Sequence, residues 1–199
     1  MNSGSLHDRQ KAIVLLVNLL HDPQTVAIAI RESVARFLAV FLKSTDQTSY
    51  QKATECIEIM SRHAVGRAMI IDTDIFDAIS QFVVHPDEFC RLQVNRTILR
   101  ISCSKDGVNK IHQLGQFKVY MSIVSLEPSN IQVLLLETLR NCIRNTEGDL
   151  PLLATECDSL RILTEIARSS LSTAVKSLAC ECVMMLWYQL NNTQSPSRP

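Results

Sequence analysis

One spacing recurs along this chain and restricts its fold more than any other feature. Gly66, Gly107 and Gly148 each open a similar stretch, with spacings of 107 − 66 = 41 and 148 − 107 = 41. Self-similarity at about 40 residues, with two or three helices per unit, is typical of armadillo and HEAT repeats. The sequence therefore predicts an all-α fold, a right-handed superhelical solenoid of the armadillo/HEAT type.

Large apolar residues repeat with the same period as the glycines. Two ladders have this spacing between successive members (98 − 57 = 41 and 101 − 60 = 41): Ile57, Ile98 and Leu139, and Met60, Ile101 and Cys142. Equivalent residues of stacked repeats occupy equivalent places in the continuous core of a solenoid. We therefore expect the core to stay in register from one repeat to the next.

The stretch 107–145 shows the plan of one repeat. A short helix opens at Gly107, a medium helix is expected over about 117–126, and a long helix over about 130–144. Pro128 separates the last two, because proline disfavours helical backbone in the residue before it. Gly66 opens the preceding repeat, where we expect it to provide the non-helical backbone that follows a helix end.

This plan divides the chain into one partial repeat and four full repeats. The expected solenoid covers 6–190, with a partial repeat at 6–22 and repeats at 23–64, 65–105, 106–146 and 147–190. The polar segments 1–5 and 191–199 are expected to be disordered. The partial repeat is a single long helix, and its predicted inward stripe consists of Ala12, Leu15, Leu16, Leu19 and Leu20.

Composition and charge narrow the classes of partner. Acidic and basic residues balance at 20 each, so no overall charge favours nucleic acid or a membrane surface. The apolar runs are shorter than a bilayer-spanning helix, and the polar start lacks a signal-peptide core. The seven cysteines are scattered at mostly apolar helical positions. We interpret them as reduced, buried thiols of a cytosolic protein rather than as a zinc site.

The sequence contains no arrangement typical of a catalytic site. No two histidines have i,i+4 spacing, and there is no glycine-rich phosphate-binding loop. We therefore expect no enzymatic activity, no cofactor, no metal and no small-molecule substrate. A surface that binds other proteins is the function that this pattern favours.

Three segments resemble a particular armadillo family. RQKAIVLLVNLLHDP at 9–23, HAVGR at 63–67 and CRLQVNRTILRIS at 90–102 are similar to segments of the radial spoke head 14 homolog family. The resemblance runs in order over roughly 9–186. Members of that family are longer, so it implies a shortened or divergent member.

The resemblance implies a place in the cell and a set of partners. It implies a non-catalytic structural component of the radial spoke in the axoneme of cilia or flagella, within the cytoplasm and cytoskeleton. Its partners would be other radial spoke subunits or axonemal proteins. The alternative is a soluble armadillo adaptor for another cytoskeletal assembly or for nuclear transport. Localisation of a tagged copy in ciliated cells separates the two.

The expected long helices would line the concave face of the armadillo stack, and we expect partners to bind on this face and at the ends of the stack. Four arginines form a basic patch on two of these helices: Arg96, Arg100, Arg140 and Arg144. Asn141 lies one period from Arg100 (141 − 100 = 41) and joins the same surface. We expect the patch to bind an acidic segment of a partner, because the planar guanidinium binds carboxylates in pairs. The alternative is a solvated helix face with internal pairs, such as Glu137 with Arg140 or Asn141.

The end of the last long helix is a second candidate surface. Its sequence, VMMLWYQL, includes Met184, Met185, Trp187 and Tyr188. Methionine and tryptophan at the end of a repeat stack favour docking of another protein, with Trp187 as the main contact. The alternative is that these side chains close the core themselves.

Overall fold

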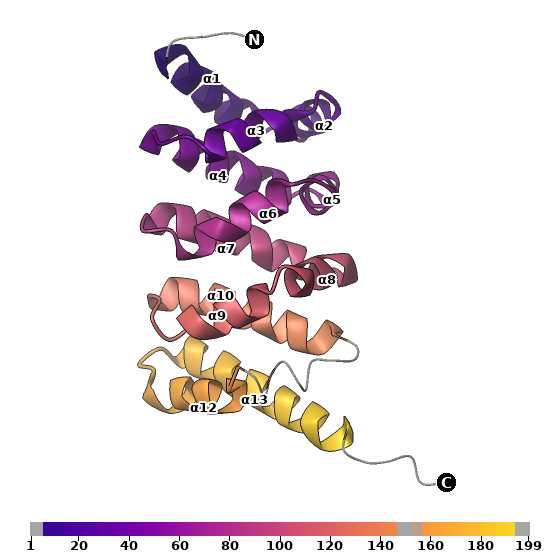
Figure 1. Cartoon of the computed structure of the whole chain (residues 1–199), viewed down its shortest axis with the longest axis vertical. Helices are drawn as coiled ribbons and strands as arrows, with labels where there is room; N and C mark the ends of the chain where they lie inside the picture. Colours follow the sequence, from indigo (N-terminus) through magenta and orange to yellow (C-terminus); the bar gives the residue numbers. More distant parts are fainter. Residues whose placement is uncertain (1–5, 147–153, 155–156, 194–199) are drawn as a thin grey trace, which may run out of the picture. The chain divides into compact units, whose positions relative to one another are not determined.

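The computed structural model describes residues 6–146, 154 and 157–193 (Figure 1). Every regular element in these ranges is a helix, which confirms the all-α prediction. The chain divides into two compact units, Met1–Ile101 (unit 1) and Ser102–Pro199 (unit 2). Over the same ranges, no helix is both long and apolar enough to cross a lipid bilayer.

Unit 1 consists of three long helices and two layers of shorter ones. Its elements are α1 (Leu6–Leu19), α2 (Pro23–Arg31), α3 (Val34–Leu42), α4 (Gln47–Ser61), α5 (Ala64–Asp72), α6 (Ile75–Ser80), the 3-10 helix η1 (Gln81–Val84) and α7 (Glu88–Ile101). The long helix α4 packs between α1 and α7, while α2 packs on α5 and α3 on α6. Like therefore packs on like, as in stacked three-helix repeats (Figure 1).

Unit 2 continues the same plan. Its described helices are α8 (Lys105–Gln113), α9 (Gln116–Ile123), α10 (Ser129–Asn145), α12 (Ser159–Ser169) and α13 (Thr173–Thr193). The long helix α10 packs on α8, α9 and α13, and α12 packs along α13. The expected start of the last repeat, with Pro151 in its first helix, lies outside the described residues, as do 1–5 and 194–199.

Short polar residues set the starts of these helices. Asp46 caps α4 by accepting a hydrogen bond from the backbone N–H of Ser49 at 2.8 Å. Ser104 caps α8 in the same way, accepting from Gly107 N at 3.1 Å. Three middle helices begin after a residue with left-handed backbone: Ser33, Gly115 and Asp158. The side chains of Asp46 and Ser104 satisfy N–H groups that have no partner within the helix, and so fix where α4 and α8 begin.

The two predicted ladders form the core in register. All six members are at most 1% exposed: Ile57, Ile98, Leu139, Met60, Ile101 and Cys142. They lie in pairs on the long helices α4, α7 and α10. The repeat period therefore describes the packing of the side chains as well as the spacing of the helices.

Gly66 does not have the role that the sequence suggested. It is the third residue of α5, and its backbone is helical. A Cβ atom at this position would lie 2.0 Å from the carbonyl oxygen of Met60. The residue is therefore needed for the close approach of α5 to the end of α4, not for a break in the helix.

Two further expectations need correction. The buried residues of α1 are Ile13 and Val17, neither of which belongs to the predicted stripe. Of that stripe, Leu20, directly after the helix, is buried, but Leu15 and Leu19 are 58% and 48% exposed. No described helix covers the exposed members of the stripe, Ala12, Leu15 and Leu19. The predicted start of the C-terminal tail, residue 191, is also too early, because α13 continues through Thr193.

Candidate protein-binding surface

A charged cluster in unit 1 is built around one buried carboxylate. The side chain of Glu58, near the end of α4, is only 2% exposed. Arg62, one turn later, donates to Glu58 Oε2 from Nη2 at 2.7 Å and from Nε at 3.2 Å. Arg100 of α7 lies 2.8 Å from the other oxygen, Oε1. A desolvated carboxylate needs such partners, and here it receives one on its own helix and one on the next.

Arg100 is therefore engaged within the protein. Besides Glu58, its Nη1 donates to Ser61 Oγ at 3.2 Å and to the carbonyl oxygen of Arg96 at 3.4 Å. This internal pairing is what the alternative interpretation of the basic patch expected of its arginines. Binding of a partner by Arg100 stays a prediction.

Arg62 and Arg96 keep much of their surface in solvent. The side chain of Arg62 is 48% exposed, and Arg96 is exposed one turn before Arg100 on α7. We define the unit 1 arginine cluster as Arg62, Arg96 and Arg100 together with Glu58. These four side chains together carry a charge of 3 − 1 = +2.

A pair of Gln–Asp hydrogen bonds holds the long helices of unit 1 in register. Gln10 Nε2 of α1 donates to Asp46 Oδ1 at 3.1 Å, and Gln51 Nε2 of α4 donates to Asp87 Oδ2 at 2.6 Å. Both aspartates also accept from the first turn of the following helix. The Ser49 side chain, then Gln10 and the Ser49 backbone N–H, stabilise the carboxylate of Asp46 and lower its pKa below the usual value. Sequence reasoning missed this contact, although its glutamines and its aspartates are each one period apart (51 − 10 = 41 and 87 − 46 = 41).

The unit 2 members of the predicted patch are also partly paired. Arg140 Nη1 lies 3.1 Å from Glu181 Oε2 of α13, so its acidic partner is not the expected Glu137. Asn141 Nδ2 donates to Ser102 Oγ at 2.9 Å. Arg144 is exposed and makes no ion pair within the described part of unit 2.

The predicted docking residue Trp187 is on the surface. Its side chain is 62% exposed, and Met184 and Tyr188 are 62% and 65% exposed. These side chains therefore do not close the core, and only Met185 is half-buried. Docking of a partner on Trp187 stays a prediction that this exposure permits.

The buried thiols are suited to packing rather than to chemistry. Burial raises the pKa of Cys90 to about 11 and the pKa values of Cys142 and Cys182 to about 12. A thiol acts as a nucleophile or metal ligand only as the thiolate, which is scarce at such pKa values. Among the described residues, no group of three His, Cys, Asp or Glu side chains could hold a metal ion.

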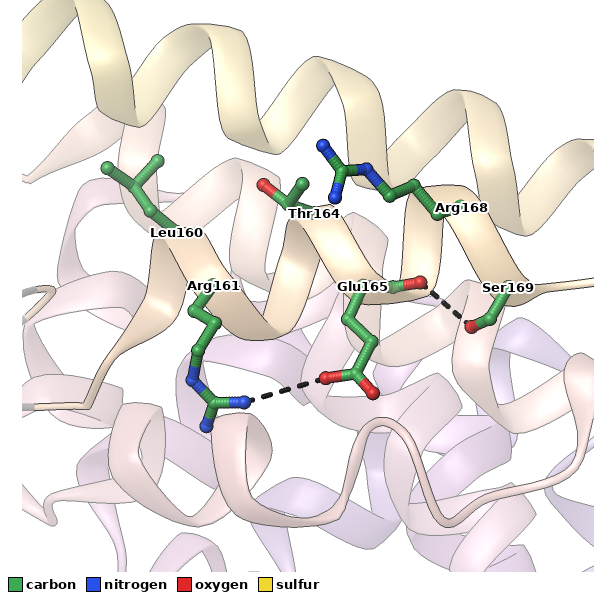
Figure 2. A pocket seen from close by; sticks show the side chains of 6 residues that line it. All are labelled: Leu160, Arg161, Thr164, Glu165, Arg168 and Ser169. Atoms are coloured by element: carbon green, nitrogen blue, oxygen red, sulfur yellow. Dashed lines mark hydrogen bonds and ion pairs between the residues drawn. The ribbon is translucent and has the colours of Figure 1, made fainter.

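A shallow hollow of about 600 Å³ lies on α12 (Figure 2). Its lining comes from that helix alone: Leu160, Arg161, Thr164, Glu165, Arg168 and Ser169. Arg161 and Glu165 form an ion pair at 3.5 Å, and Ser169 Oγ donates to the carbonyl oxygen of Glu165 at 2.8 Å. This arrangement is that of a solvated helix face with an i,i+4 pair.

Known structures agree with the repeat interpretation. No model of a known protein family matches the chain. Computationally designed armadillo repeat proteins for modular peptide recognition match it with a TM-score of 0.83 and 12% identity, over 96% of this chain and 84% of that chain. A designed armadillo repeat protein in complex with the peptide (KR)4 matches with a TM-score of 0.79 and 12% identity, over 92% and 77%.

An engineered protein from a structural genomics consortium is similar at a TM-score of 0.77 and 15% identity, over 93% of this chain and 75% of that chain. Likeness at such low identity shows a shared fold. The chain therefore has the armadillo-type helical solenoid fold that its repeat period predicted.

Proposed function

We propose that this chain is a non-catalytic protein-binding scaffold whose unit 1 arginine cluster binds an acidic segment of a partner. The observation that carries the proposal is the charge imbalance around Glu58: two guanidinium groups, those of Arg62 and Arg100, share this carboxylate. The exposed Arg96 lies one turn before Arg100 on the same helix. Arg62 and Arg96 face solvent and retain N–H donors for another carboxylate. Arginine suits this task because its planar fork binds carboxylates through two parallel hydrogen bonds.

The solved neighbours support the class of ligand. One was designed for modular peptide recognition, and another is in complex with the basic peptide (KR)4. Proteins with this fold can therefore bind a peptide. The cluster in this chain is positive, so we propose a ligand of opposite charge to (KR)4.

A labelled, glutamate-rich peptide tests this proposal by fluorescence anisotropy. The variant to compare with the unchanged chain is Arg62→Gln with Arg96→Glu, because glutamine at 62 keeps an N–H donor near Glu58 and the Glu58–Arg100 pair stays in place. We expect affinity to fall by about tenfold, because exposed ion pairs contribute about 0.2–1 kcal/mol each and charge reversal adds repulsion. Added salt should weaken binding by the unchanged chain.

The matched control is Arg36→Glu, which reverses an exposed arginine on α3, one of the shorter helices. It should bind the peptide as the unchanged chain does. Equal affinity in all three proteins, or equal loss in both variants, would contradict the proposed surface.

We further propose that the partner is another radial spoke subunit or axonemal protein, and that the chain resides in the axoneme of cilia or flagella. The resemblance of 9–23, 63–67 and 90–102 to the radial spoke head 14 homolog family supports this. A tagged copy should remain with axonemes after detergent extraction of ciliated cells. Diffuse cytosolic or nuclear signal would instead favour an armadillo adaptor for another assembly.

A further inference from the structure

The long helices of unit 1 meet along one repeating stripe. On α4 the stripe has members three and four residues apart, and every member touches α7 or the aspartate that precedes it. The contacts are Gln51 Nε2 to Asp87 Oδ2 at 2.6 Å, Thr54 Oγ1 to Cys90 Sγ at 3.7 Å, Glu58 to Arg100 at 2.8 Å and Arg100 to Ser61 Oγ at 3.2 Å. We call this face, which one long helix presents to the next, the outgoing stripe.

The same positions form the outgoing stripe in unit 2. Two periods lead from Thr54, Glu58 and Ser61 to Leu136, Arg140 and Ile143 (54 + 82 = 136, 58 + 82 = 140, 61 + 82 = 143). All three touch α13: the carbonyl oxygen of Leu136 accepts from Cys182 Sγ at 3.6 Å, Arg140 pairs with Glu181 at 3.1 Å, and the carbonyl oxygen of Ile143 accepts from Gln189 Nε2 at 2.7 Å. Equivalent positions therefore form the contact between successive long helices in both units.

On α13 the outgoing stripe is uncovered by any described helix. Pro128 directly precedes α10, and its carbonyl oxygen accepts a hydrogen bond from Gln132 N. Ser172 has the same place before α13 and accepts from Lys176 N. Equivalent residues of α10 and α13 are therefore 172 − 128 = 44 apart. The stripe of α13 is then Cys180, Met184 and Trp187 (136 + 44, 140 + 44 and 143 + 44). Cys180 is exposed, and Met184 and Trp187 are each 62% exposed. Met184 stands where the covered helices have a charge, Glu58 or Arg140.

The first described long helix, α1, has the complementary face uncovered. Arg100 receives the outgoing stripe of α4, and Cys182 receives that of α10. Two periods of 41 lead back from Arg100 on α7 to Asn18 on α1 (100 − 82 = 18). One step of 44 from α13 to α10, and then three periods of 41, lead back from Cys182 to Leu15 (182 − 44 − 3 × 41 = 15). Asn18 is exposed and Leu15 is 58% exposed. The chain thus carries both halves of its own repeat-to-repeat contact without a described partner for either.

We propose that copies of this chain join head to tail, with the outgoing stripe of α13 in one copy packed on α1 of the next. In both units this stripe is covered by a long helix of the same repeat type, and α1 is such a helix. By the register of the internal contacts, Leu15 faces Cys180 and Met184, and Asn18 faces Met184 and Trp187. The indole N–H of Trp187 then has the side-chain oxygen of Asn18 as an acceptor. Such a contact joins two different surfaces, so it extends into linear chains.

Analytical ultracentrifugation of the unchanged chain and of two one-ended variants tests this arrangement. The mass of the unchanged chain should rise with concentration. Leu15→Glu and Trp187→Glu should each stay monomeric, with association at least about thirtyfold weaker, as expected for loss of a central aromatic contact. Tyr188→Glu is the matched control: this neighbour of Trp187 is equally exposed but lies off the stripe, so it should associate normally.

An equimolar mixture of the two one-ended variants is the decisive arm. Leu15→Glu keeps an intact α13 stripe and Trp187→Glu keeps an intact α1 face, so together they should form a 1:1 dimer that grows no further. Circular dichroism checks that each variant folds, and Met184→Glu replaces Trp187→Glu if that variant does not. A strictly monomeric unchanged chain, a mixture that stays monomeric, or self-association of Leu15→Glu alone would each overturn the proposal.

Discussion

The two units join their long helices at equivalent positions but with opposite charge. In unit 1 the charge on the outgoing stripe is Glu58, which is 2% exposed and bound by two arginines. In unit 2 the equivalent residue is Arg140, and its partner Glu181 is 43% exposed. A desolvated charge depends strongly on its partner, whereas a half-exposed one is screened by water. The same position of each repeat therefore makes a polar contact between long helices. The burial of that contact determines how much it contributes to the stability of the fold.

The largest expected difference between the units concerns charge reversal at this contact. Arg100→Glu would place a second carboxylate against buried Glu58, so we expect a loss of about 3 kcal/mol or more in the free energy of unfolding. Arg140→Glu faces the half-exposed Glu181 and should cost about 1 kcal/mol or less. Urea denaturation of both variants measures the two losses. Equal losses would show that burial does not separate the contacts.

A second difference concerns two glycines. Gly66→Ala in unit 1 would force a Cβ to within 2.0 Å of a backbone oxygen, so we expect a loss of about 1–3 kcal/mol despite the better helix propensity of alanine. Gly115 in unit 2 has a φ of +65° and no neighbour within 4 Å of a Cβ. Gly115→Ala should cost about 1 kcal/mol, from left-handed backbone alone. Thermal midpoints of the two variants provide the comparison, and a larger loss for Gly115→Ala would contradict it.

The Gln–Asp contact of unit 1 should have a smaller effect. Val133 occupies the unit 2 position equivalent to Gln51 (51 + 82 = 133), so Gln51→Val transfers the unit 2 residue into unit 1. We expect a loss of about 1 kcal/mol, the usual net contribution of one hydrogen bond. Gln10→Val removes the matching bond to Asp46 and should cost a similar amount in urea denaturation. No loss in either variant would mean that the contact does not fix the register.

The smallest expected effect is a pH dependence in unit 2. His112 of α8 is half-buried, its Nε2 lies 2.6 Å from Thr146 Oγ1, and burial lowers its pKa below 6.5. The unfolded chain therefore binds the proton more readily, so this contribution to stability is present above pH 6.5 and is lost as the pH falls. His112→Gln should flatten the fall of the thermal midpoint in that range. An unchanged slope would remove His112 as its source.

The fold could be predicted because equivalent residues recur at a fixed spacing, so that each repeat can be compared with the next. The Ile57, Ile98 and Leu139 ladder could be found by arithmetic, and all three residues are buried. The face of α1 could not be predicted, because IVLLVNLL has apolar residues on every side and periodicity does not choose among them. Packing against α4 selects Ile13 and Val17 and leaves Leu15 exposed.

The candidate surface was predictable only in part. Spacing identified Arg96 and Arg100, but it did not reveal that Arg100 is bound to Glu58 of the preceding long helix. That pairing depends on the reach of two long side chains across adjacent helices, which a one-dimensional period does not contain. One signal was available: Glu58 is the only charged residue in the run CIEIM, where an unpaired carboxylate would be costly.

The arginine cluster and the docking proposal both depend on the outgoing stripe. The most direct test of this stripe is a disulfide between α4 and α7. Thr54 Oγ1 lies 3.7 Å from Cys90 Sγ. Thr54→Cys, refolded from the reduced, unfolded chain with oxidised glutathione so that both thiols are accessible before they pack, should therefore form a disulfide with Cys90, detected by mass spectrometry of peptides. The control Glu55→Cys, one residue away and off the stripe, should not link to Cys90. A link from the control, or none from Thr54→Cys, would contradict the register on which this account depends.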